Sequence, residues 1–182
     1  MWKSEPIMIL TGSKIKQEYQ EGNIVLDPYD EAMINPNSVD YRLGPSLKKF
    51  DYFDGKKSYF KDIEFPEEGV VLEPHEMYLG HTLEVIGSKK YAMSLIGRSS
   101  IGRLGLFLQV SADLLHTTSE HQVTLEIVAT KPIRIYPNMI IGQVSFWKNC
   151  GDVVVSPKTY ALLNGAQESR QADKIAQERG EK

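Results

Sequence analysis

Short apolar runs set the hydrophobic pattern of this 182-residue chain. They are rich in β-branched residues and alternate with breaks that contain proline, glycine, asparagine or aspartate. The pattern predicts strands over residues 24–26, 39–43, 70–72, 77–85, 91–95, 106–110, 123–129, 133–135 and 141–147. Many short strands at this spacing are typical of a β-sandwich or a β-barrel, so we expect an all-β fold.

One short helix is predicted near the N-terminus. Residues 11–13 (TGS) are a typical helix start, Ile15 and Tyr19 fall four residues apart on one face, and Gly22 ends the run. The helix is short, so we expect it to cap a sheet.

The chain is predicted to form one domain, because its length suits a single hydrophobic core. Acidic, basic and aromatic residues alternate over residues 51–68, which indicates a surface insertion or a hairpin. Apolar residues become rare from residue 167 onward. We therefore expect a domain over residues 1–166 and a charged, mobile tail over residues 167–182.

Composition narrows the classes of protein to consider. The formal net charge is −3 and the pI is about 5.8, so there is no broad basic field for a nucleic-acid polymer. The single cysteine, Cys150, excludes an internal disulfide and fits a reducing compartment. No apolar run approaches the roughly 20 residues of a membrane span. The sequence predicts a soluble cytoplasmic protein that does not contact a membrane.

Residues 97–105 (GRSSIGRLG) concentrate groups that bind anions. Arg98 and Arg103 offer guanidinium donors, Ser99 and Ser100 add hydroxyls, and the glycines let a ligand approach the backbone. These residue types at this density indicate a site for a polyphosphate. Free nucleotide is a better candidate than a polymer, because the net charge is negative and the sequence shows no local basic patch outside Arg98 and Arg103.

Glu126 is a lone carboxylate in an apolar strand. Val123, Leu125 and Ile127 alternate with Thr124 and Glu126, so the glutamate is expected on the strand face opposite the apolar one. A carboxylate in such a position is a candidate general acid or base.

The histidines and the cysteine do not indicate metal chemistry. A zinc nucleoside deaminase needs His-x-Glu and Pro-Cys-x-x-Cys motifs, which a chain with one cysteine cannot supply. His116, Glu120 and His121 have a spacing that matches neither common metallohydrolase motif. His75 and His81 flank the start of a predicted strand and are interpreted as surface or turn histidines. We therefore expect no metal held by the protein, and no zinc.

Five segments in order resemble one known family. They are residues 37–44 (NSVDYRLG), 97–106 (GRSSIGRLGL), 123–126 (VTLE), 137–146 (PNMIIGQVSF) and 160–170 (YALLNGAQESR). The chain resembles the dCTP deaminase branch of the dUTPase-like superfamily over most of its length. This resemblance implies a distorted jelly-roll-like β-barrel that assembles as a homotrimer, with active sites at the subunit interfaces.

The resemblance also implies roles for individual residues. Glu126 would act as general base and then acid, while Arg103 and Ser99 would orient the water and stabilise developing charge. Magnesium would accompany the nucleotide triphosphate without a metal site on the protein. The implied substrate-binding residues are Arg98, Ser99, Ser100, Val110, Ala112, His116, Gln143, Tyr160 and Arg170.

The chain departs from the family pattern in two places. Residues 116–121 (HTTSEH) stand where relatives have Asp-Pro-Gly-aromatic-x-Gly, so His116 becomes the candidate partner of the sugar hydroxyl. Thr159 and Leu163 replace a lysine and a glutamine of the C-terminal arm.

Three hypotheses for the function follow. The leading one is metal-independent deamination of dCTP to dUTP and ammonia. The second is a dUTPase or a bifunctional dCTP deaminase and dUTP diphosphatase, and the third is a catalytically silent, nucleotide-binding regulatory trimer.

Overall fold

The computed structural model of the protein describes residues 8–109, 111–154, 164–169, 171 and 178. Helices in this part are α1 (Gly12–Gln20), α2 (Ser99–Gly102) and a 3-10 turn over Glu31–Met33. The strands are β1 (Ile24–Asp27), β2 (Val39–Arg42), β3 (Leu47–Phe53), β4 (Ser58–Ile63), β5 (Val70–Leu72), β6 (Met77–Ser88), β7 (Tyr91–Gly97), β8 (Leu106–Leu108), β9 (Leu114–Leu115), β10 (Glu120–Ala129), β11 (Ile133–Ile135) and β12 (Ile140–Lys148). The predicted all-β fold with a short N-terminal helix is confirmed.

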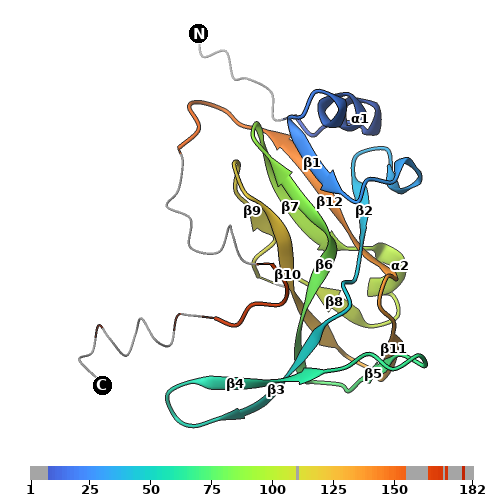
Figure 1. Ribbon diagram of the computed structural model, residues 1–182, viewed down its shortest axis with the longest axis vertical. Coiled ribbons are helices and arrows are strands. Elements are labelled where there is room, and N and C mark those ends of the chain that lie inside the picture. Colours follow the sequence, from blue (N-terminus) through green and yellow to red (C-terminus); the bar gives the residue numbers. More distant parts are fainter. Residues whose placement is uncertain (1–7, 110, 155–163, 170, 172–177, 179–182) are drawn as a thin grey trace.

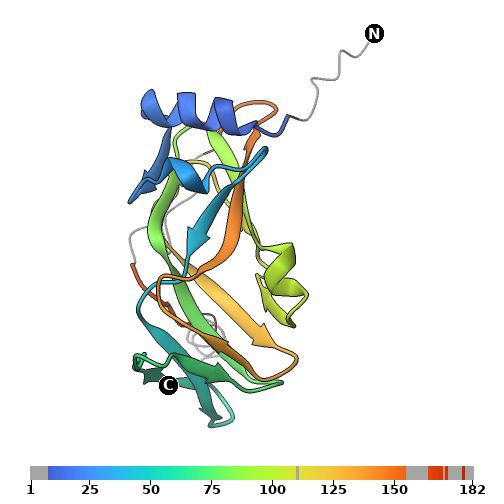
Figure 2. The same ribbon diagram turned by 90° about the vertical axis from the view of Figure 1, so that its right-hand side faces the viewer.

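Two larger sheets and one small sheet make up the molecule (Figures 1 and 2). One sheet has the strand order β4-β3-β6-β10-β8, and β1 also pairs with β6. The second has the order β2-β12-β7-β9, and β5 pairs with β11 in the small sheet. Both larger sheets contribute buried side chains to one core, including Ile86, Leu95, Ile127 and Phe146. Truncating such a side chain to alanine typically costs about 2–5 kcal/mol, so this shared core holds the sheets together.

Gly44 and Gly142 lie in two of the segments that resemble the family, and close packing requires a glycine at each position. A Cβ on Gly44 would overlap the imidazole of His81, and a Cβ on Gly142 would overlap the phenol of Tyr41. The Tyr41 hydroxyl donates a hydrogen bond to the carbonyl of Ile96 (3.2 Å). His81 is therefore buried within β6, and its interpretation as a surface or turn residue is wrong. His75 does lie exposed in a turn, with φ of 64°.

The strands β3 and β4 form a hairpin that projects from one end of the molecule (Figure 1). It starts at Leu47, four residues before the predicted segment 51–68, and ends at Ile63. The Tyr52 and Tyr59 rings stack with centroids 4.7 Å apart. The hairpin prediction is confirmed, and paired aromatic rings stiffen this two-stranded projection.

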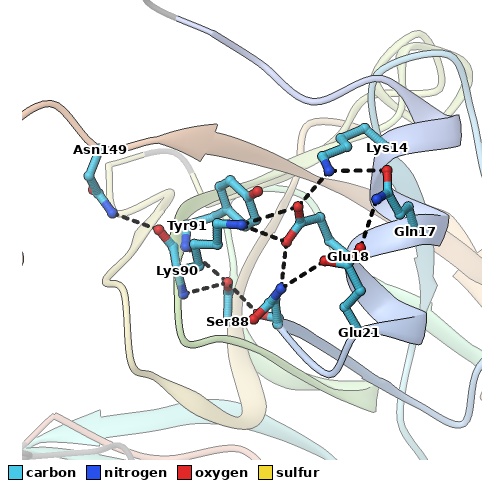
Figure 3. Close-up of polar contacts among 9 residues, drawn as sticks. Lys14, Gln17, Glu18, Glu21, Ser88, Lys90, Tyr91 and Asn149 are labelled. Carbon is cyan, nitrogen blue, oxygen red and sulfur yellow. Dashed lines mark hydrogen bonds and ion pairs between the residues drawn. The ribbon is translucent and has the colours of Figure 1, made fainter.

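Helix α1 lies across the other end of the molecule, and a buried carboxylate fixes it there (Figures 2 and 3). Glu18 has no exposed surface, and its oxygens lie 2.8 Å from the ammonium of Lys14 and 3.1 Å from that of Lys90. Asn23 donates a further hydrogen bond of 2.8 Å. Burial alone would raise the pKa of Glu18, but hydrogen bonds from Lys14, Tyr91, Lys90 and Asn23 lower it to about 2.

This cluster borders a cavity of about 560 Å³, here called the α1 cavity, whose walls include Leu10, Lys14, Glu18 and Val153. In the described part of the chain, no helix has the length and apolar character needed to cross a bilayer.

Candidate active site

Strand β10 presents Glu126 on its outer face. Val123, Leu125 and Ile127 are buried, whereas Thr124 and Glu126 are only partly buried, as the alternation of the sequence predicts. The neighbouring strand β8 ends at Leu108, two residues before the end of the predicted strand 106–110. The reason is local: Gln109 adopts a positive φ of 50°, which a strand does not accommodate.

Gln109 then holds the backbone of Glu126 from the side. The side-chain oxygen of Gln109 accepts a hydrogen bond from the backbone N–H of Glu126 (2.8 Å), and the backbone N–H of Gln109 donates to the carbonyl of Glu126 (3.1 Å). The amide group of Gln109 also donates to the carbonyl of Ala112 (3.1 Å). One side chain thus fixes the strand that carries the glutamate relative to the loop that carries Ala112.

A cavity of about 510 Å³ opens beside Glu126 and is here called the Glu126 cavity. Thr124, Glu126 and His121 line it from β10, and Ala112 and Asp113 line it from the loop before β9. The carboxylate of Glu126 has no hydrogen-bond or ion-pair partner within the described residues. An acid or base with that freedom can exchange a proton with a bound molecule.

The Glu126 cavity is acidic. Asp113, Glu126 and Glu168 line it, and no lysine or arginine is among the described residues of its wall. Ser94 donates a short hydrogen bond to the Asp113 carboxylate (2.6 Å). Because like charges repel strongly where water is partly excluded, this cavity alone does not favour a polyphosphate.

Residues 98–103, which hold the arginines and serines predicted to bind phosphate, lie outside the Glu126 cavity. Ser99, Ser100 and Arg103 are exposed in and after α2, and none of them is among the described residues that line the Glu126 cavity. Arg98 is also outside the wall, and its guanidinium lies 3.4 Å from the Asp40 carboxylate. Among the described residues of one chain, Arg98, Ser99, Ser100 and Arg103 do not share a cavity with Glu126.

Gln143 lies beside the Arg98–Asp40 pair rather than in the Glu126 cavity. It pairs in register with Asp40 on β2 and Ile96 on β7, and its side-chain oxygen accepts a hydrogen bond from Ser38 (2.8 Å). His116 is exposed in the turn before β10 and is not part of the described cavity wall either. The predicted residues Val110, Tyr160 and Arg170 lie outside the described residues.

The sequence analysis did not single out His121 as a site residue, yet its imidazole lines the Glu126 cavity. The Nδ1–H of His121 donates to the carbonyl of Gln122 (2.8 Å), because a carbonyl oxygen can only accept. In the neutral ring, Nε2 is then an acceptor. The sequence could not indicate this position, because residues 116–121 read as a turn.

A segment near the C-terminus completes the wall. Gln167, Glu168 and Ser169 line the Glu126 cavity, so residues just after the predicted domain boundary at 166 contact the domain. Most residues beyond 169 lie outside the described part, and the mobility of the tail stays a prediction.

Comparison with known proteins gives a consistent family. The model of the family described as dCTP deaminase-like matches residues 9–149. A protein from Clostridium acetobutylicum named "dCTP deaminase, dUMP-forming" is 43% identical over 148 residues, which cover 80% of this chain and 85% of the relative. A "dCTP deaminase" from Rhodopirellula baltica is 36% identical over 153 residues, covering 82% of this chain and 77% of the relative.

A solved structure agrees with the fold. The crystal structure of 2′-deoxycytidine 5′-triphosphate deaminase from Agrobacterium tumefaciens superposes with a TM-score of 0.64 at 20% identity. The match covers 80% of this chain and spans 49% of that longer chain. At this identity it supports the fold alone, and the fold is the one that the resemblance implied. With a family model over residues 9–149 and relatives above 40% identity, the chain belongs to the dCTP deaminase-like family.

Proposed function

We propose that this protein is a hydrolytic deaminase that converts dCTP to dUMP. The observation that carries the proposal is the carboxylate of Glu126, which lines a cavity together with Ala112 and has no partner among the described residues. Relatives from Clostridium acetobutylicum and Clostridium beijerinckii, at 43% and 42% identity, are named dUMP-forming. That name corrects the expected product, which the sequence analysis gave as dUTP.

The conversion to dUMP needs two hydrolyses. In the first, water adds to C4 of cytosine and the C–N bond breaks, so that dCTP and water give dUTP and ammonia. In the second, water breaks the bond between the α- and β-phosphates, so that dUTP and water give dUMP and pyrophosphate. The sum is dCTP and two waters to dUMP, pyrophosphate and ammonia. This net reaction is also the one that a bifunctional deaminase and diphosphatase would perform.

Glu126 is assigned the proton transfers of the deamination. Its carboxylate takes a proton from the attacking water and delivers it to ring N3. It then takes the proton of the new C4 hydroxyl and delivers it to the departing amine, so that the C4 carbonyl and ammonia form together. Backbone groups near Ala112 would read the pyrimidine edge, since Gln109 fixes that loop beside Glu126. Such a role is typically worth roughly 10²- to 10⁴-fold in rate.

The triphosphate must find its cations outside the acidic cavity wall. We place Arg98, Ser99, Ser100 and Arg103 of a neighbouring copy against the phosphates, with Arg103 and Ser99 also orienting the water. Exposed apolar side chains lie close to this segment in the sequence, namely Ile96, Leu104 and Phe107. A cluster of exposed apolar side chains is typical of a protein–protein interface, and it supports association as a homotrimer.

Magnesium belongs with the substrate in this proposal. It would bind the triphosphate oxygens and lower their charge without contacting the C–N bond that breaks. The described residues contain no group of three or more His, Cys, Asp or Glu side chains placed to hold a metal ion.

An end-point assay tests the activity. Purified protein is incubated with dCTP, dCMP or dUTP, with and without magnesium, and ammonia, pyrophosphate and nucleotides are measured by chromatography. We expect dUMP, pyrophosphate and ammonia from dCTP. Accumulation of dUTP without pyrophosphate would overturn the proposed product, and nucleotide binding without turnover would overturn the proposed enzyme.

Mixing two inactive variants tests the shared site. Glu126→Gln and Arg103→Ala are each expected to lose activity, and after random exchange of equal amounts about a quarter of all sites should hold both native groups. Recovered activity on mixing, together with a trimer by light scattering, is the expected result. A monomer with no recovery would place both groups in the same chain's site and overturn the shared-site proposal.

A further inference from the structure

Residues 164–169, here called the C-terminal segment, cross the outer face of the larger sheet. On β10, the Gly165 N–H donates to the Gln122 side chain (3.1 Å) and the Gln167 N–H donates to the Thr124 hydroxyl (3.0 Å). On β3, the carboxylate of Glu168 lies 3.1 Å from the Lys48 ammonium. Because β10 and β3 flank β6 in the sheet, these contacts join the segment to both neighbours of the strand that pairs with Glu126.

Lys48 is placed to hold this segment firmly. Its side chain is 22% exposed and that of Glu168 is 32% exposed, so water screens the pair less than it screens an ion pair on the open surface. Asp62 of β4 lies 3.1 Å from the same ammonium, but its side chain is 81% exposed. Burial alone would lower the pKa of Lys48, yet hydrogen bonds to Glu168 and Asp62 raise it above its usual value.

We propose that Lys48 is a positioning residue that fixes the C-terminal segment through Glu168 as one wall of the Glu126 cavity, and thereby sets the affinity for the nucleotide. The proposal rests on the proposed function, because the nucleotide is the ligand of that cavity. Gln167, Glu168 and Ser169 all line it, so a shift of the segment changes its shape directly. Without the ion pair, the contacts that still hold the segment among the described residues are hydrogen bonds to Gln122 and Thr124 of β10 and the burial of Ala166.

Two variants separate positioning from simple charge. Lys48→Met keeps an aliphatic side chain in β3 but leaves Glu168 unpaired, which makes the cavity more acidic. Glu168→Gln leaves Lys48 paired with Asp62 alone, and it makes the cavity less acidic because Glu168 lines the wall. If charge alone mattered, the first variant would raise KM for dCTP and the second would lower it. If the pair positions the wall, both variants raise KM, by about threefold to tenfold, with kcat within about twofold of the native value.

Asp62→Asn provides the matched control. It removes a carboxylate from the same ammonium without touching the C-terminal segment, so KM and kcat should stay at the native values. The double variant Lys48→Met/Glu168→Gln should be no worse than the worse single variant, because the two residues act as one pair. A lowered KM in Glu168→Gln, or an equal rise in Asp62→Asn, would overturn the proposal.

Amide hydrogen exchange tests the position of the segment without turnover. In the absence of nucleotide, the Gly165 and Gln167 amides should exchange several-fold faster in Glu168→Gln than in the native protein, and at the native rate in Asp62→Asn. Unchanged exchange in Glu168→Gln would refute the positioning role. If the native protein fails to deaminate dCTP, this measurement still decides whether Lys48 holds the segment, so the two proposals can fail separately.

Discussion

Two cavities of similar size, the α1 cavity and the Glu126 cavity, each contain a glutamate in a different state. Glu18 has two ammonium groups, an amide and a phenol around its carboxylate, and it has no exposed surface. Glu126 is only partly buried, and its carboxylate has no partner within the described residues. The charge of Glu18 is therefore balanced by lysines of its own chain, whereas the carboxylate of Glu126 is available to a bound molecule.

This difference separates a structural carboxylate from a chemical one. A carboxylate whose hydrogen-bonding capacity is filled by its own chain stabilises the fold and has nothing to offer a ligand. An unpartnered carboxylate in a cavity contributes little to folding but can bind or move a proton. We therefore expect changes at Glu18 to alter stability with activity intact, and changes at Glu126 to alter activity with stability intact.

The largest expected effect is the loss of turnover in Glu126→Gln. The amide cannot take a proton from water, so kcat for dCTP should fall roughly 10²- to 10⁴-fold. Nucleotide affinity, measured by calorimetry, and the midpoint of thermal unfolding should stay close to native values, because the carboxylate has no partner to lose in the part of the chain that the structure describes. Near-native kcat in this variant would remove Glu126 from the mechanism.

Glu18→Gln should show the opposite behaviour. An amide cannot balance Lys14 and Lys90, whose side chains are 41% and 53% exposed, and the loss of hydrogen bonds to a buried charged group typically costs about 1.5–3 kcal/mol. The urea midpoint of unfolding should drop accordingly, while kcat and KM of the protein that remains folded should not change. A variant that loses kcat while keeping its stability would contradict the division between the two cavities.

The sequence predicted those parts of the fold that depend on local alternation. Val123, Leu125 and Ile127 against Thr124 and Glu126 correctly gave both the strand and the outward direction of the glutamate. The start of β10 at Glu120 could not be predicted, because the polar residues there become a strand only by pairing with β6. The local pattern of residues predicts a single strand, whereas the pairing of that strand also depends on the neighbouring strand.

In the candidate site, too, residues marked by the local sequence could be predicted, whereas those brought in by strand pairing could not. Glu126 could be found because a lone carboxylate in an apolar strand is unusual. His121 could not, because its approach to the cavity depends on how β10 pairs with β6, where the register shifts between Gln122 and Thr124. The pair of Lys48 and Glu168 joins residues 120 positions apart, and no local pattern relates them.

At acid pH, protonation of Glu18 should lower the free energy of unfolding of the protein. The pKa of its carboxyl is about 2 in the folded protein against 4.5 as the ordinary value, so its stabilisation is complete above pH 4.5 and is lost as the pH falls toward 2. By pH 3 the loss should reach about 2 kcal/mol. Urea unfolding of the native protein and of Glu18→Gln at pH 7 and pH 3 isolates this contribution, because all other groups cancel. A stability difference between the two proteins that stays constant with pH would mean that Glu18 does not titrate as described.

The smallest expected effect comes from an ion pair of the same helix that points to solvent. Lys16 of α1 pairs with Glu31, and the two side chains are 40% and 63% exposed. Water and salt screen such a pair, and ordering two long side chains offsets most of its attraction. Lys16→Met should therefore leave the urea midpoint within experimental error at low and at high salt, unlike Glu18→Gln. The Lys16–Glu31 and Glu18–Lys90 pairs each join α1 to another segment of the chain. A comparable loss of stability in Lys16→Met would therefore show that the number of ion pairs, and not the burial of the carboxylate, holds the helix in place.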